Sequence, residues 1–169
     1  MIWFIDGYNV IRRDPELAGL DRRSLEDGRR GLLRLVAQVA REGPDDFVVV
    51  FDGARISAPP SGDGRVRVVF SRPPDRADDV LIRLARQRGA GATVVTCDRE
   101  IQNAARRARV AVVAADVFLE RAVQPATEEG GDRDADDDAA RPRPKRGNPR
   151  RRSREERAAQ RALRRLRPG

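Results

Sequence analysis

Five short apolar runs, separated by turn-rich or amphipathic segments, constrain the fold of this 169-residue chain more than any other feature. Each run has the length of a strand that is buried on both faces. The expected strands are Met1–Ile5, Phe47–Phe51, Val66–Phe70, Ala92–Thr96 and Val110–Ala114. Such strands alternating with helices are typical of a mostly parallel sheet covered on both sides. The sequence therefore predicts an α/β fold.

The segments between these runs carry helix signals. A helix is expected from Ser24 to Arg41, because Ser24 with Asp27 three residues later resembles a capping box and an apolar face follows. Gly43-Pro44 ends this helix. Further helices are expected after Pro73-Pro74, over Arg99–Arg109 and over Val117–Val123. Right-handed crossovers then bring the carboxyl ends of all strands to one edge of the sheet.

Charge divides the chain into a domain and an appendage. Residues 1–124 have ordinary polarity, whereas residues 125–169 hold 14 basic against 9 acidic side chains. Residues 125–152 are almost devoid of apolar side chains, which predicts a charged, disordered linker. Residues 153–169 begin with a capping box and predict a basic C-terminal helix over 154–167, with the alternative that it orders only on binding.

The net charge of +8 and the pI of about 11.1 favour a polyanionic partner. The basic tail is interpreted as an anchor for RNA or for the ribosome. A solvated extension without a specific task is the alternative, and the acidic block at 128–138 allows a weaker hypothesis of self-inhibition.

Residue types that are rare or missing exclude several chemistries. The chain has no histidine and a single cysteine, Cys97, so Ser-His-Asp catalysis, intrachain disulfides and cysteine-cluster zinc sites are excluded. Asp6 interrupts the one apolar run near the N-terminus, and no run approaches the roughly 20 residues of a membrane span. The expectation is a soluble, cytoplasmic protein without a membrane partner.

Acidic residues follow several of the expected strands. Asp6 follows the first strand, Asp52 the second and Asp98 the fourth, while Asp78-Asp79 opens the helix after the third. These carboxylates should therefore meet at one edge of the sheet, which is where ligands bind in such folds. Crowded carboxylates repel one another, and a hard divalent cation such as Mg²⁺ or Mn²⁺ would supply the counter-charge. Water activated by this ion would be the nucleophile for phosphodiester cleavage.

Each acid also has a simpler interpretation. Asp98 stands where a helix N-cap is expected. Asp78 fits the last position of a capping box begun by Asp75, and Asp79 favours the helix dipole. The acids after the first two strands each precede a glycine, so they also suit a turn.

Four motifs occur in the order and approximate spacing of a known family. They are Ile5-Asp6-Gly7-Tyr8-Asn9-Val10, Val50-Phe51-Asp52-Gly53, Arg76-Ala77-Asp78-Asp79-Val80 and Val95-Thr96-Cys97-Asp98. Residues 1–124 thereby resemble the YacP-like NYN domains of the PIN-like ribonuclease superfamily. The resemblance implies a parallel sheet of order 3-2-1-4-5 and divalent-metal-dependent endonucleolytic cleavage of RNA. PIN-like domains often pair, so a homodimer is left open.

The resemblance also implies roles for individual residues. The acids that correspond to the family's metal site are Asp6, Asp52, Asp78 and Asp98. Asn9 would position Asp6 or the substrate, Asp79 would be an accessory acid in catalysis, and Thr96 would line the site beside the RNA. Whether Asp78 or Asp79 binds the metal stays open at this point.

Further residues near this edge are candidates for contacting RNA. Tyr8 suits stacking on a base, with packing beneath the substrate as the alternative. Arg12, Arg13, Arg55 and Arg72 are expected on loops leaving the edge, where they would hold phosphates or be ordinary solvated charges.

Two function classes compete on this evidence. The first is a metal-dependent endoribonuclease that cleaves mRNA or rRNA. The second is a non-catalytic RNA- or ribosome-binding module with a nuclease-like fold. An aspartyl phosphatase is disfavoured, because Tyr8 stands where that chemistry generally has a second acid two residues after Asp6.

Overall fold

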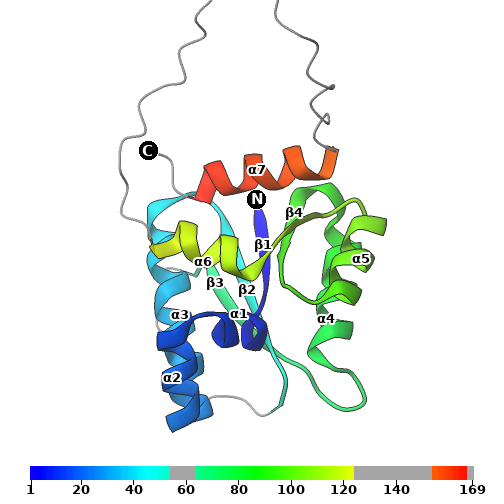
Figure 1. The fold of residues 1–169 in the computed structure, drawn as a ribbon. Coiled ribbons are helices and arrows are strands. Elements are labelled where there is room, and N and C mark those ends of the chain that lie inside the picture. The colour runs from blue at the N-terminus through cyan, green and yellow to red at the C-terminus, as the bar shows by residue number, and fades with distance from the viewer. Residues whose placement is uncertain (54–63, 124–153, 167–169) are drawn as a thin grey trace, which may run out of the picture.

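The computed structural model describes residues 1–53, 64–123 and 154–166. Five parallel strands form one sheet in the order β3-β2-β1-β4-β5, which confirms the predicted topology. The strands are β1 (Ile2–Asp6), β2 (Asp46–Phe51), β3 (Val66–Phe70), β4 (Ala92–Val95) and β5 (Ala111–Val113). Figure 1 shows this sheet between two groups of helices.

The helices are named in chain order. They are α1 (Gly7–Arg13), α2 (Pro15–Arg23), α3 (Leu25–Glu42), α4 (Ala77–Arg88), the 3₁₀ turn η1 (Gly89–Gly91), α5 (Arg99–Arg107), α6 (Ala115–Val123) and α7 (Arg154–Leu166). Side chains along β1 point alternately to the two faces of the sheet, and each face is covered by its own layer of helices. Trp3 and Ile5 face a core formed with α1, α2, α3, α6 and α7, whereas Ile2 and Phe4 face a core formed with α4 and α5.

Two helices were not predicted from the sequence. Helices α1 and α2 occupy the segment after β1, for which no helix was expected. The signal for α2 was present: Asp14 Oδ1 accepts from the backbone N–H groups of Glu16 and Leu17, and Pro15 occupies the first turn. The expectation that Arg12 and Arg13 lie on a loop is therefore wrong, because both lie in the last turn of α1.

The other helices lie close to their predicted positions. Ser24 caps α3 by accepting from Glu26 N at 3.1 Å, whereas Asp27 is ion-paired with Arg30 instead of completing a capping box. Helix α5 ends at Arg107, two residues earlier than expected.

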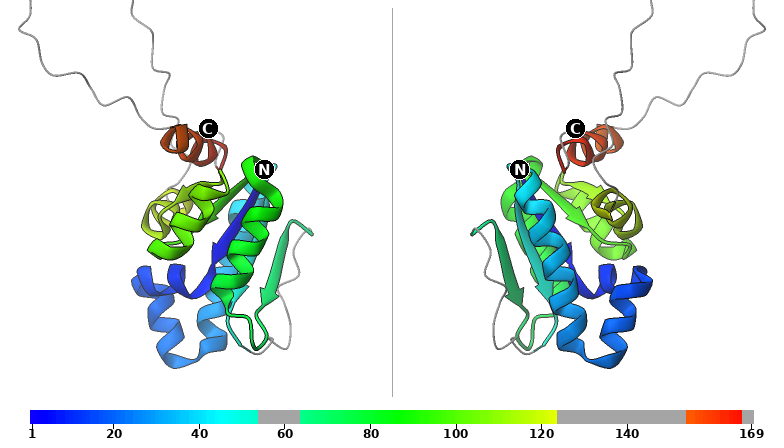
Figure 2. Two further views of the ribbon diagram at one scale, coloured as in Figure 1. Left: turned by 90° about the vertical axis from the view of Figure 1, so that its right-hand side faces the viewer. Right: turned by 90° about the vertical axis from the view of Figure 1, so that its left-hand side faces the viewer.

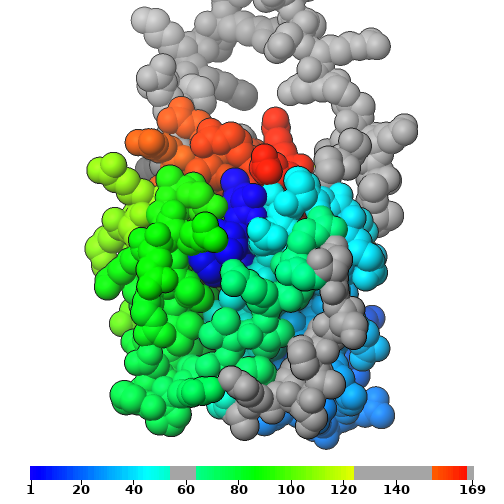
Figure 3. Space-filling model, turned by 180° about the vertical axis from the view of Figure 1, so that it is seen from behind, coloured from blue at the N-terminus to red at the C-terminus, as the bar shows by residue number. Residues whose placement is uncertain are grey.

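Helix α7 packs on the domain, although residues 154–167 were assigned to a tail outside it. Ala162 and Leu166 are fully buried in the core that contains Trp3. Arg165 donates to Asp45 Oδ1 at 3.1 Å, and Trp3 Nε1 donates to Asp45 Oδ2 at 3.1 Å, so one buried carboxylate joins α7 to β1. The helix crosses the end of the sheet opposite α1 (Figure 2), above the first residues of β1 (Figure 3).

The predicted linker, residues 125–152, lies outside the described residues. None of the helices in the described ranges has the length and apolar character that crossing a membrane requires.

Candidate active site

Asp6 is the most buried acid at the carboxyl edge of the sheet, with 9% of its surface exposed. It ends β1 and caps α1, because its Oδ1 accepts from Asn9 N at 3.2 Å. The following helix begins at Gly7, where a Cβ atom would stand 2.2 Å from the ring of Phe51. Glycine thus lets α1 start directly above β2, which fixes the direction of the Asp6 carboxylate.

Thr96 links Asp6 to Asp98. The Thr96 hydroxyl donates to Asp6 Oδ2 and accepts from Asp98 N, each at 3.0 Å, and Thr96 is fully buried. Asp98 also caps α5, since its Oδ1 accepts from Glu100 N at 2.7 Å. The capping interpretation of Asp98 is therefore correct. Asp98 can cap α5 and also belong to the acidic site, because the cap itself holds Asp98 beside Asp6.

Asp52 connects β2 to the start of α4. Its Oδ1 accepts from Ser71 Oγ at 2.6 Å and from Ala77 N at 2.7 Å. Ala77 is the first residue of α4, and Asp78 is the second. Asp52 therefore helps to place Asp78 through one of its own carboxylate oxygens.

Asp78 and Asp79 occupy different environments. Asp79 is exposed, and its Oδ2 accepts from Arg76 N at 2.9 Å, so Asp79 completes the cap of α4. Asp78 is half-buried and interacts electrostatically with Asp98 and Asp52. The capping box predicted from Asp75 to Asp78 is wrong by one residue, because it runs from Arg76 to Asp79. Asp78 is thus the acid of this pair that faces the other carboxylates.

Two carboxylates at this edge, those of Asp6 and Asp78, resist ionisation. Burial, reinforced by repulsion from Asp78 and Asp98, raises the pKa of Asp6 from 3.8 to about 6, although the hydrogen bonds from Thr96 and Asn9 oppose the shift. The pKa of Asp78 is raised as well, mainly by burial and to a smaller extent by repulsion from Asp98 and Asp52. Negative charge is therefore concentrated here beyond what the surrounding protein neutralises.

The chemistry of these donors fits a hard divalent cation. All of the candidate ligands are carboxylate oxygens, which Mg²⁺ and Mn²⁺ prefer. Within the described ranges no three acidic or cysteine side chains converge closely enough to hold an ion by themselves. Mg²⁺ is commonly bound through one or two carboxylates with waters completing its shell, so this spacing suits it. A bound cation would relieve the repulsion between these incompletely neutralised carboxylates.

The burial of Asp6 leads to a testable pH dependence in the absence of metal. Its protonated form stabilises the fold below pH 3.8, and that stability is lost as the pH rises through about 6. We expect Asp6→Asn and the parent to have similar unfolding free energies near pH 4. At pH 8 in EDTA the variant should be more stable by about 3 kcal/mol. Urea unfolding at both pH values measures these free energies. The same difference between variant and parent at pH 4 and at pH 8 would contradict the prediction.

Asn9 and Tyr8 support the site from the first turn of α1. Asn9 Oδ1 accepts from Cys97 N at 2.8 Å, which ties α1 to the segment that carries Thr96 and Asp98. The Tyr8 ring contacts Phe51 edge to face with 5.3 Å between the centroids. The packed alternative for Tyr8 therefore holds in this structure, and contact of its half-buried ring with a base remains a prediction.

Arg29 was not identified from the sequence, although a signal was available. It lies between Leu25 and Leu32 at helical spacing, a position where an apolar residue is expected on α3. The side chain is 9% exposed, and its Nε donates to Tyr8 Oη at 2.8 Å. Its Nη2 donates to the Asp52 carbonyl oxygen at 3.2 Å. Arg29 thus places a fixed positive charge under the acidic edge and holds two parts of it.

The arginines that were predicted to contact RNA, where the structure describes them, lie at different distances from the acidic edge. The Arg12 guanidinium lies 6.0 Å from the centre of the Tyr8 ring, which places it at the edge. Arg13 interacts electrostatically with Asp116, whose carboxylate accepts from Cys97 Sγ at 2.9 Å. Arg72 is exposed on the segment between β3 and α4. Arg55 lies outside the described residues.

Comparisons with known proteins identify relatives of this chain. The model of the YacP-like NYN domain family matches residues 3–166, and so extends past residue 124, where the resemblance was expected to end. The uncharacterized protein YacP of Bacillus subtilis (strain 168) is 30% identical over 86 residues, half of this chain. The chain spans about half the length of that curated relative.

Two solved structures have the same fold. The crystal structure of Rae1 (YacP) from Bacillus subtilis is 27% identical with a TM-score of 0.63, and the match covers 72% of this chain and 73% of that one. The crystal structure of a mutant of the same Bacillus subtilis protein is 26% identical with a TM-score of 0.61, covering 72% and 74%.

Proposed function

Because the chain belongs to the YacP-like NYN domain family, which has a nuclease-like fold related to RNA, we propose that it is a divalent-metal-dependent endoribonuclease. One observation carries the proposal. Asp6, Asp52, Asp78 and Asp98 come from four separate segments and meet at one sheet edge, where burial and mutual repulsion raise the pKa of Asp6 to about 6. Such incompletely neutralised carboxylates are suited to binding a cation.

The acidic residues and Thr96 would have different roles in binding the metal ion and in positioning its ligands. Asp6, Asp78 and Asp98 would provide the carboxylates for Mg²⁺ or Mn²⁺, together with the second oxygen of Asp52, which also anchors α4. One or two of these carboxylates would bind the ion directly, and the others would bind it through its waters. Thr96 would keep the Asp6 and Asp98 carboxylates in register through its two hydrogen bonds. When bound, the ion would lower the pKa of a coordinated water and stabilise negative charge on the phosphoryl group. Asp79 would act indirectly, through its cap on α4.

The surface around the acids would receive the RNA strand. Tyr8 presents an aromatic ring that is fixed from below by Arg29 and Phe51, so a base that stacks on it would meet a rigid surface. Arg12 beside this ring and Arg72 on the segment before α4 would contact phosphates. We propose mRNA or rRNA in the cytoplasm as the substrate class. The ribosome is proposed as a partner through the basic C-terminal segment.

Metal removal tests the mechanism directly. The purified chain, incubated with a 5′-labelled single-stranded RNA, should give internal cleavage products in Mg²⁺ or Mn²⁺. In excess EDTA the cleavage rate should fall by on the order of 10³-fold or more, because activated water is lost. Adding back Mn²⁺ should restore the rate, whereas Ca²⁺, which prefers more ligands at longer distances, should restore it poorly. Undiminished cleavage in EDTA would contradict metal dependence.

A non-catalytic RNA-binding module is the second candidate. The observation that favours it is the basic surface of α7, which carries five arginines against Glu155 and Glu156. Single-turnover assays with several RNAs distinguish the two functions. Tight, salt-sensitive binding without a metal-dependent product on any of them would support the module, whereas metal-dependent internal cleavage supports the nuclease.

A further inference from the structure

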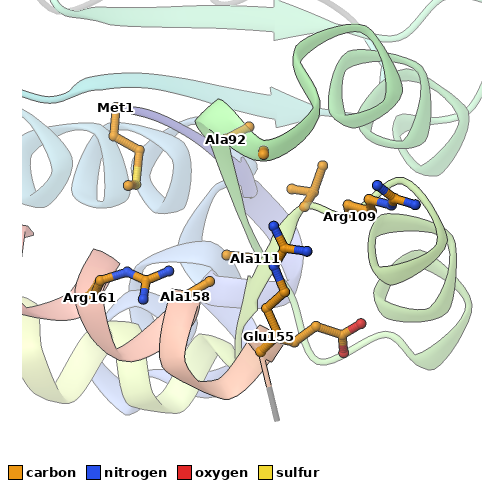
Figure 4. Close-up of a pocket in the computed structure, with 10 residues that line it drawn as sticks. Met1, Ala92, Arg109, Ala111, Glu155, Ala158 and Arg161 are labelled. Carbon is orange, nitrogen blue, oxygen red and sulfur yellow. The ribbon is translucent and has the colours of Figure 1, made fainter.

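A second concave site lies at the opposite end of the sheet from the acids. A cavity of about 470 Å³ opens between α7 and the first residues of β4 and β5 (Figure 4). Its volume falls in the range of small-ligand sites. The strands that separate it from the acids are three to five residues long, so the two ends are roughly 15 Å apart. The cavity is therefore not part of the candidate active site.

The cavity has an apolar floor and a basic rim. The floor includes the side chains of Met1, Ala92, Ala111 and Ala158. Arg109, Arg154 and Arg161 line it as well, and Figure 4 shows Arg109 and Arg161 on opposite sides of the cavity. No carboxylate of the described residues is ion-paired with any of these three arginines.

One acid lines the cavity, and its charge is directed elsewhere. Glu155 Oε2 lies 3.7 Å from Arg106 Nε on α5. The carboxylate is thus partly balanced by a cation that does not line the cavity. Three arginines around an apolar floor then leave a positive potential that favours an anionic group.

The backbone at Arg109 gives independent support. Arg109 has φ = 59°, the left-handed conformation in which a residue with a Cβ costs about 1–2 kcal/mol relative to glycine. Glycine is usual at such positions after a helix. An arginine is kept after α5 at an energetic cost, at the position where its side chain enters the rim. Strain of this kind tends to accompany functional sites.

We propose that this cavity binds a nucleoside phosphate, with the base against the apolar floor and the phosphate held by Arg109 and Arg161. Guanidinium groups bind phosphates by charge-assisted hydrogen bonds, and a floor of methyl and thioether groups suits the face of a base. The ligand has two sources: one nucleotide of an RNA strand, or a free nucleotide. In the first case the RNA would be held at one end of the domain and cut at the other.

Binding at this site can be measured without cleavage. Isothermal titration calorimetry of the full chain in EDTA, with AMP and with a single-stranded RNA oligonucleotide as separate probes, avoids any metal-dependent reaction. Arg109→Gly removes the guanidinium and relieves the backbone conformation, so the fold is preserved. Arg161→Ala removes the facing guanidinium from an exposed helix position. Arg164→Ala is the matched control, because it removes the same charge from α7 away from the cavity.

Each outcome bears on the proposal. We expect Arg109→Gly and Arg161→Ala each to weaken binding by about tenfold or more, whereas Arg164→Ala changes the binding of AMP less than about threefold. If Arg109→Gly and Arg161→Ala lose the binding of AMP, the ligand of the cavity is a free nucleotide. If they lose only the binding of the oligonucleotide, the ligand is a nucleotide of an RNA strand. Equal weakening by all three variants, or no binding of either probe, would overturn the proposal. Retained metal-dependent cleavage of a short RNA by these variants separates this result from the fate of the proposed nuclease activity.

Discussion

Asp6→Asn is expected to reduce RNA cleavage by on the order of 10³-fold, with little change in fold. The substitution keeps the shape of the side chain and an oxygen for the Thr96 hydroxyl, but it removes the most buried negative charge of the candidate site. A cation would lose its central ligand, and loss of one electrostatic group from an active site typically costs this much. Initial rates on a labelled RNA under saturating Mg²⁺ measure the effect.

Asp79→Asn is the matched control for this substitution. It removes the same charge from the same edge, but Asp79 is exposed and caps α4 through Arg76 N. We expect its cleavage rate to stay within about tenfold of the parent, since a lost cap costs only about 1 kcal/mol. Full activity of Asp6→Asn, or equal losses in both variants, would contradict the assignment of Asp6 to the metal.

Leu166→Ala is expected to destabilise the domain by about 2–5 kcal/mol. Leu166 lies in the last turn of α7, and its side chain is 1% exposed within the core that contains Trp3 and Phe47. Truncating it leaves a cavity where α7 meets the body of the protein. Urea unfolding followed by Trp3 fluorescence measures the change, because this is the one tryptophan of the chain.

Leu163→Ala provides the comparison within the same helix. Leu163 packs against the same core but is only partly buried, so its truncation should cost clearly less. If neither substitution altered stability, α7 would not be docked in the free protein. That result would favour the alternative in which the basic helix orders only on binding.

Much of the fold was accessible from the sequence because burial on both faces leaves continuous apolar runs. Phe47–Phe51 and Val66–Phe70 coincide with strands to within one residue. Helix α1 was not accessible, because it follows β1 without an intervening loop. Its cap is Asp6 itself, a residue interpreted as a ligand rather than as the start of a helix.

The site was partly predictable for a related reason. Parallel strands bring Asp6 and Asp98 to one edge, and this follows from topology alone. The choice between Asp78 and Asp79 depends on which backbone N–H begins α4, and a shift of one residue exchanges their roles. Asp45 and Arg29 were missed because their partners are distant in the sequence. Nothing local indicates that Asp45 meets Trp3 and Arg165, 42 and 120 residues away.

The docking of α7 has a consequence for the order in which the protein is assembled. Contacts between residues far apart in the sequence form late, because a long loop must close first. Every residue of the acidic edge lies before residue 117, whereas the core beside Trp3 is completed only by Ala162 and Leu166. A chain emerging from its N-terminus would thus shape the acidic edge first and close its hydrophobic core last.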